Sequence, residues 1–81
     1  MSVRTKFIQC VSDAVLDQLL DRLLDKKVLN EGEIESVKLK KRADKAREIF
    51  DMVKRKGDEA SAILMKGIKD LDSFFYKELD N

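Results

Sequence analysis

Histidine, tryptophan and proline are absent from the 81-residue chain, and cysteine occurs once, at Cys10. Without histidine the chain has no Cys/His metal cluster, and it lacks the usual general base for a serine or cysteine nucleophile. A single cysteine also excludes an internal disulfide. We therefore expect that the protein is not an enzyme and that it binds no metal or other cofactor.

Long apolar stretches are also missing. No run of apolar residues approaches the ~18–20 that a membrane-spanning helix needs, and the first residues lack the apolar core of a secretory signal. We therefore expect no membrane partner, a cytoplasmic location and a reduced thiol. Because Cys10 stands close to Phe7, Ile8 and Val11, it is predicted to be a small buried apolar residue.

The scarcity of helix-breaking residues predicts an all-α protein. The chain has no proline and only three glycines, and no segment alternates apolar and polar residues as a strand would. Apolar residues make up 43% of the sequence, which suffices for one compact core. With only 81 residues there is no room for a second core, so residues 1–81 are expected to form one helical domain.

Six helical segments follow from the spacing of apolar residues and from capping signals. In the second segment apolar residues fall in pairs every four residues, which is the wide apolar stripe of a helix packed on a core. The connections are short, so consecutive helices must pack on one another in a six-helix bundle. The predicted segments are 3–10, 12–27, a third that opens at Asn30, a fourth that ends at 56, 58–68 and 70–79.

Several residues predict where these helices begin and end. Asn30 and Glu33 have the spacing of a capping box. Gly57 is suited to the left-handed turn that follows a helix. Gly67, inside the fifth segment, costs about 1 kcal/mol relative to alanine. It therefore indicates either a closely packed neighbour or a frayed helix.

The net charge of +1 conceals a strong segregation of charge. Residues 1–12 carry +2 and residues 13–35 carry −4, whereas residues 38–56 carry +6 and residues 57–81 carry −3. The first and fourth predicted helices are therefore basic, and the second and third are acidic. Charge segregation of this kind favours binding through complementary surfaces.

Acidic residues also recur along one line of the second predicted helix. Like charges four residues apart cost a helix roughly 0.2–0.5 kcal/mol per pair. A plain solvated face is one interpretation, but the basic counterpart elsewhere in the chain favours a binding surface. The aspartates of this ridge are Asp13, Asp17, Asp21 and Asp25.

The basic stretch 38–56 leaves open a second class of function, a small nucleic-acid-binding domain. Nine lysines and arginines lie there against three acidic residues. However, no aromatic residues are interleaved in 38–47 to stack on bases, and Asp44, Glu48 and Asp51 would face phosphates poorly. Nucleic acid is therefore the alternative partner and not the expected one.

One segment resembles a known family. Residues 19–30, LLDRLLDKKVLN, are similar to the second helix and following turn of caspase recruitment domains, or CARDs, a branch of the death-domain superfamily. The similarity is greatest to the domains of inflammatory caspases and their CARD-only relatives. Residues 33–38 resemble the third helix, 44–57 the fourth, and Phe7 and Ile8 match the first.

The resemblance implies a fold, a function and a set of partners. The fold is a six-helix antiparallel bundle with death-fold Greek-key topology. The function is homotypic binding to the CARD of a caspase, adaptor or receptor in inflammatory or apoptotic signalling. The partner can be a component of an inflammasome. The chain would be either a free-standing regulator or one domain of such a protein. Self-association is expected at high concentration, because two different faces allow head-to-tail growth.

The resemblance also implies which residues make the contact. An acidic face on the second and third helices would meet a basic face on the first and fourth. Asp21 and Arg47 match the family's positions most directly, and the others are their neighbours. The acidic residues are Asp17, Asp21, Asp25 and Glu33, and the basic residues are Arg4, Lys45 and Arg47.

Overall fold

The computed structural model describes residues 1–80, and within them the chain forms six α-helices. The expected all-α fold of six helices is confirmed. The helices are α1 (Val3–Cys10), α2 (Asp13–Asp25), α3 (Glu31–Val37), α4 (Arg42–Arg55), α5 (Asp58–Leu71) and α6 (Ser73–Asp80).

Polar side chains cap the first three helices at their N-termini. The hydroxyls of Ser2 and Ser12 each accept a hydrogen bond from a backbone N–H of the first turn of α1 and α2, at 3.1 Å. At α3 the predicted capping box is present. The Asn30 side chain accepts from the Glu33 N–H at 2.8 Å, and Glu33 accepts from the Asn30 N–H at 2.9 Å. In each of these helices the cap thereby satisfies one of the first backbone donors, which have no partner inside the helix.

Left-handed residues end two of the helices. Gly57 follows α4 with a φ of 109°, as its position predicted. The second left-handed residue is Lys27, with a φ of 62°. The Val28 N–H bonds the Leu23 carbonyl and the Lys27 N–H bonds the Leu24 carbonyl, which is the Schellman pattern. For this reason α2 ends at Asp25, two residues before the predicted end.

The boundary between α5 and α6 also differs from the prediction. α5 continues to Leu71, so Asp70, the predicted start of the last helix, belongs to the final turn of α5. The aspartate that caps α6 is Asp72, whose side chain accepts a hydrogen bond from the Phe75 N–H at 3.0 Å. Two aspartates stand near this junction in the sequence, and either could have been the cap.

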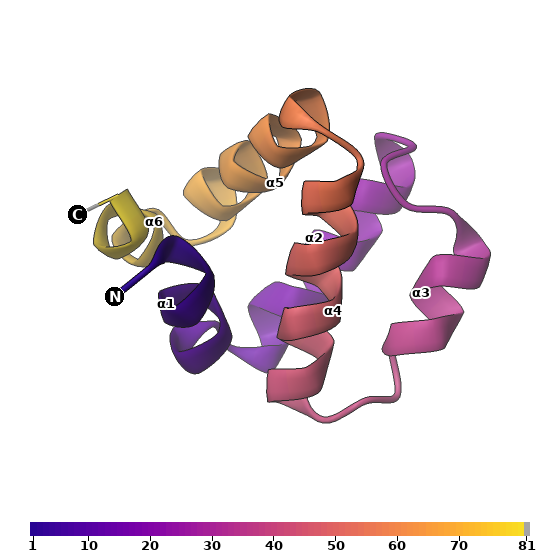
Figure 1. The fold of residues 1–81 in the computed structure, drawn as a ribbon, viewed down its shortest axis with the longest axis horizontal. Coiled ribbons are helices and arrows are strands. Elements are labelled where there is room, and N and C mark those ends of the chain that lie inside the picture. Colours follow the sequence, from indigo (N-terminus) through magenta and orange to yellow (C-terminus); the bar gives the residue numbers. More distant parts are fainter. Residues whose placement is uncertain (81) are drawn as a thin grey trace.

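The helices pack so that the two ends of the chain meet. α1 contacts α4 and α6, α5 contacts α2, α4 and α6, and α3 packs against α2 and α4. Figure 1 shows α1 and α6 side by side at one end of the molecule, with α3 at the other end. α2 and α4 therefore connect the two ends and carry five of the seven predicted contact residues.

The core is apolar and closely packed. Phe7 is fully buried, and its ring centroid lies 5.5 Å from that of Phe50 and 6.2 Å from that of Phe75. Gly67 is buried where α5 meets α2. A Cβ atom there would lie 3.0 Å from Leu19 Cδ2 and 3.1 Å from Arg22 Cδ. Of the two explanations for this glycine, the structure shows the closely packed neighbour.

The prediction that Cys10 is buried is wrong. Phe7 and Ile8 form the buried face of α1, and Cys10 is exposed. Because successive residues of a helix are rotated by about 100°, Cys10 stands about 60° from Phe7 and about 160° from Ile8, at the margin of that face. Among the helices of residues 1–80, none has the length and apolar character needed to cross a membrane.

Candidate interaction surfaces

The acidic ridge lies on the outer side of α2. The inner side of this helix holds four buried leucines, Leu16, Leu19, Leu20 and Leu23, and the aspartates fall between them on the exposed side. Asp21 and Asp25 are both exposed, and within residues 1–80 neither accepts a hydrogen bond from a basic side chain. They are therefore the two ridge carboxylates that are available to an incoming cation.

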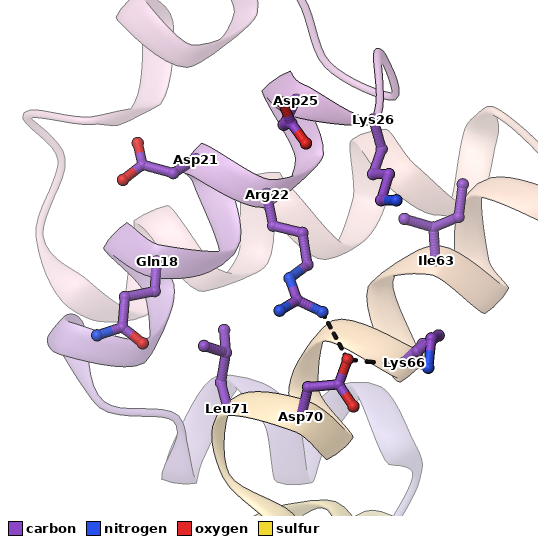
Figure 2. Close-up of a pocket in the computed structure, with 9 residues that line it drawn as sticks. All are labelled: Gln18, Asp21, Arg22, Asp25, Lys26, Ile63, Lys66, Asp70 and Leu71. Atoms are coloured by element: carbon purple, nitrogen blue, oxygen red, sulfur yellow. Dashed lines mark hydrogen bonds and ion pairs between the residues drawn. The ribbon is translucent and has the colours of Figure 1, made fainter.

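Between α2 and α5 the surface is hollowed into a groove of about 800 Å³. Asp21 and Asp25 stand on its α2 side, and Lys66 and Asp70 on its α5 side. Figure 2 shows Arg22 crossing this groove toward α5, where its Nη1 lies 2.7 Å from Asp70 Oδ2. The Arg22 hydrogen bond is the main reason that the pKa of Asp70 lies below its ordinary value.

Asp17, the third predicted acidic residue, is turned toward α4. Its Oδ1 accepts a hydrogen bond from Lys45 Nζ at 3.2 Å, and Asp13 accepts from the same ammonium at 3.2 Å. The Asp17 side chain remains 65% exposed. It therefore lies at the edge of the acidic surface with part of its charge already compensated within the molecule.

Lys45, predicted as a member of the basic face, is only 6% exposed. Burial by itself lowers the pKa of its ammonium, but the hydrogen bonds to Asp13 and Asp17 outweigh it, so that the pKa stands above 10.5. Lys45 shares one side of α4 with Ile49 and Met52, four and seven residues further on, and both are buried. That periodicity was the signal in the sequence that Lys45 faces inward.

Glu33 is held by two contacts inside the molecule. It completes the capping box of α3, and its Oε1 lies 2.6 Å from Lys56 Nζ. The Lys56 hydrogen bond, followed by that from the Asn30 N–H, lowers the pKa of Glu33 below its ordinary value. Its side chain is 28% exposed, so Glu33 connects α3 to the end of α4 and presents only part of its carboxylate to solvent.

Arg4 and Arg47 come together on the surface that α1 and α4 share. Arg4 binds Asp51 through two hydrogen bonds, Nε to Oδ1 at 2.9 Å and Nη2 to Oδ2 at 3.1 Å. Arg47 binds Asp44 at 2.7 Å. The Arg4 hydrogen bond is the main cause of the lowered pKa of Asp51, and the charges of Arg55 and Arg47 add to it. The charges of three arginines therefore act on one carboxylate, and Arg4 is the one that binds it.

Arg55 is the member of this cluster that the sequence interpretation missed. Arg47, Asp51 and Arg55 are four residues apart on α4, so all three lie along the same side of the helix. Arg55 is exposed. We refer to Arg4, Arg47 and Arg55 as the arginine cluster, and to Asp21 and Asp25 as the acidic pair.

The structure therefore separates the predicted residues into two groups. Arg4 and Arg47 on one side, and Asp21 and Asp25 on the other, are exposed and lie on different helices. Asp17, Glu33 and Lys45 make ion pairs between helices in which one side chain is 28% exposed or less. The Arg4–Asp51 pair also joins two helices, but its side chains are 44% and 38% exposed. The first group is therefore more accessible from outside the molecule than the second.

A comparison with protein families found that the model of the caspase recruitment domain matches residues 2–81. No protein of curated function matches the chain significantly, and no solved structure does so. Within residues 1–80, no group of three or more cysteine, aspartate or glutamate side chains is arranged to hold a metal ion.

Proposed function

The chain belongs to the caspase recruitment domain family, whose members are protein-interaction domains that pair with domains of the same kind. From that premise we propose that the acidic pair on α2 of one domain contacts the arginine cluster on α1 and α4 of another. The observation that carries this proposal is the position of the two groups. They have opposite charge, they are exposed, and they lie on different helices.

The acidic pair and the arginine cluster differ in their contacts inside the molecule, and both can form ion pairs with a partner. Arg4 and Arg47 have carboxylate partners of their own, at side-chain exposures of 44% and 47%. An exposed ion pair is worth about 0–1 kcal/mol. Replacing Asp44 by a carboxylate of a partner therefore costs little, whereas Arg4 is held more firmly because it binds Asp51 through two hydrogen bonds. The acidic pair gains cations, which it does not bind within residues 1–80.

Because the acidic pair and the arginine cluster are different surfaces, a contact between two domains leaves one of each unoccupied. Such a head-to-tail contact propagates unless it closes into a ring. A single contact of exposed charges is weak and is loosened by salt. Repeated contacts supply avidity. We therefore infer a domain that is monomeric when dilute and assembles cooperatively at high concentration.

The partners follow from the family. We propose that this domain recruits or regulates an inflammatory or apoptotic caspase, or a component of an inflammasome, in the cytoplasm. The partner would be the CARD of a caspase, an adaptor or a receptor. No catalytic step by this chain is needed for that role, because recruitment changes only the local concentration of the partner.

Charge reversal on each surface tests the proposed contact. Arg47→Glu and Asp21→Lys should each raise the protein concentration at which assembly begins, as measured by light scattering at physiological salt. Helicity measured by circular dichroism should be unchanged, because both side chains are exposed. If both variants stay folded and assemble like the parent, the contact between two surfaces is wrong.

A mixture of the two variants provides the matched control. In the mixture, the unchanged acidic pair of Arg47→Glu can meet the unchanged arginine cluster of Asp21→Lys, and the two reversed surfaces can meet each other. Association should therefore return as pairs of unlike molecules, which analytical ultracentrifugation can detect. A mixture that remains monomeric while each variant is folded would show that these two surfaces do not face one another.

The alternative of nucleic-acid binding finds less support in the structure. Three of the basic residues between 38 and 56 are engaged inside the molecule. Lys45 is buried, and Lys56 binds Glu33. Arg42 donates hydrogen bonds to the carbonyls of Ile8 and Val11. Titration with duplex DNA at two salt concentrations separates the two functions. Salt-dependent binding at physiological salt would support the alternative.

A further inference from the structure

The aspartates of the acidic pair have an arginine between them. Arg22 lies one residue after Asp21 and three residues before Asp25, and side chains three apart on a helix are neighbours. Pairs three residues apart do form in this molecule, with the acidic residue first, since Arg47 binds Asp44 and Lys38 binds Glu35, both at 2.7 Å. An Arg22 free to follow the same course would neutralise part of the acidic pair.

In the structure Arg22 is directed away from both aspartates. Figure 2 shows Asp21 and Asp25 pointing outward from α2, while the guanidinium of Arg22 extends across the groove to Asp70 on α5. The side chains of Arg22 and Asp70 are 33% and 41% exposed. The closest competing cation for Asp70 is Lys66, whose Nζ lies farther away, at 3.9 Å.

Gly67 provides the path that Arg22 follows. A Cβ atom at this position would lie 3.1 Å from Arg22 Cδ and 4.0 Å from its Nε, so the arginine stem runs along bare backbone of α5. Leu19, one turn before Arg22, is fully buried against the same part of α5. The course of Arg22 is therefore fixed at its stem by Gly67 and at its head by Asp70.

From this geometry we propose that Asp70 is a positioning residue for the acidic surface, acting by holding the guanidinium of Arg22 on α5 and away from Asp21 and Asp25. Asp70 itself need not touch the partner. This inference rests on the proposed function and extends it to a residue on α5, a helix that carries none of the predicted contact residues.

Three variants test the inference. Asp70→Asn removes the charge that holds Arg22, and Arg22→Gln/Asp70→Asn removes both charges. Glu78→Gln removes one carboxylate from α6 as a matched control. One measurement is ¹⁵N relaxation of the Arg22 Nε–H in the dilute monomer, which reports whether this side chain is ordered. The other is the concentration at which assembly begins.

The Nε–H of Arg22 should be ordered in the parent and mobile in Asp70→Asn. The assembly concentration of Asp70→Asn should rise by about two- to fivefold, which is the effect of one exposed charge interaction. The double variant should return to the parent value, because the released arginine is gone. Glu78→Gln should assemble like the parent.

Other results would overturn the inference. If Arg22 remains ordered in Asp70→Asn, another group holds it. If the double variant assembles as poorly as Asp70→Asn, then Asp70 acts directly on the partner. Parent-like assembly of Asp70→Asn, with impaired assembly of Asp21→Lys, would overturn this inference alone. Parent-like assembly of Asp21→Lys would overturn the proposed function together with it.

Discussion

A lysine is seldom buried in a small protein, and Lys45 is the residue where charge and fold are most closely coupled. Its ammonium joins α4 to the first turns of α2 through Asp13 and Asp17, whose side chains are 60% and 65% exposed. Hydrated carboxylates therefore compensate a buried cation. Removing the cation leaves no buried charge behind, whereas reversing it would bury a carboxylate beside two others.

Substitutions at Lys45 should therefore differ in their effect on stability. Lys45→Glu is expected to lower the free energy of unfolding by about 3–5 kcal/mol, and Lys45→Met, which keeps the apolar stem, by about 1 kcal/mol. Urea denaturation measures both values. Lys45→Met should assemble like the parent, whereas Arg47→Met should assemble less well. Equal impairment of the two variants would place Lys45 in the contact between domains.

At the scale of the helices, the junction of α2 and α5 is the most tightly constrained contact. Gly67→Ala improves helix propensity by about 1 kcal/mol. However, the new methyl group would lie 3.0 Å from Leu19 Cδ2, and Leu19 is fully buried, so it must shift within the packed core. Overpacking of this kind costs about 1–3 kcal/mol.

We therefore expect Gly67→Ala to reduce the free energy of unfolding by up to about 2 kcal/mol, as measured by denaturant titration. Gly32→Ala on α3 is the matched control, because a Cβ atom there meets only Asn30 Oδ1, at 3.4 Å. It should be neutral or stabilising. A gain in stability from Gly67→Ala would show that Leu19 and Arg22 can move aside.

The six helices could be predicted from the sequence because apolar spacing and caps act locally. The Asn30–Glu33 capping box and Gly57 are where they were expected. The left-handed Lys27 could not be predicted, since lysine has no special preference for that conformation.

The sign of the charge on each candidate surface could be predicted from the sequence. The ion pairs that its residues make within the molecule could not. Arg4 and Asp51 are 47 residues apart, and Arg22 and Asp70 are 48 apart. Only the packing of the helices brings such residues together. For the same reason the sequence could not show which acidic residues are already paired. Glu33 binds Lys56, whereas Asp21 and Asp25 have no basic side-chain partner within residues 1–80.

For the whole molecule, stability should depend on pH through three carboxylates. The pKa values of Glu33, Asp51 and Asp70 are lowered by hydrogen bonds from Lys56, Arg4 and Arg22, from ordinary values of 4.5, 3.8 and 3.8. The unfolded chain therefore binds more protons than the folded protein as the pH falls below these values. The contribution of the three pairs is complete at neutral pH and is lost progressively below about pH 4.5.

Thermal unfolding between pH 3 and pH 7 measures this dependence. The midpoint should be nearly constant above pH 5 and should fall below pH 4.5. Glu33→Gln keeps an acceptor for the capping box and removes the titrating group, so its curve should fall less steeply. An identical slope for the parent and Glu33→Gln would show that Glu33 does not contribute to acid sensitivity.

The contact between α1 and α6 brings the beginning and the end of the described chain to the same side of the molecule (Figure 1). A short linker could therefore join the two ends without moving either helix. New ends could then be opened in the exposed turn at Lys38–Lys41, where the Leu39 side chain is 91% exposed. The order of the helices along the chain can thus be permuted while the acidic pair and the arginine cluster keep their positions in space.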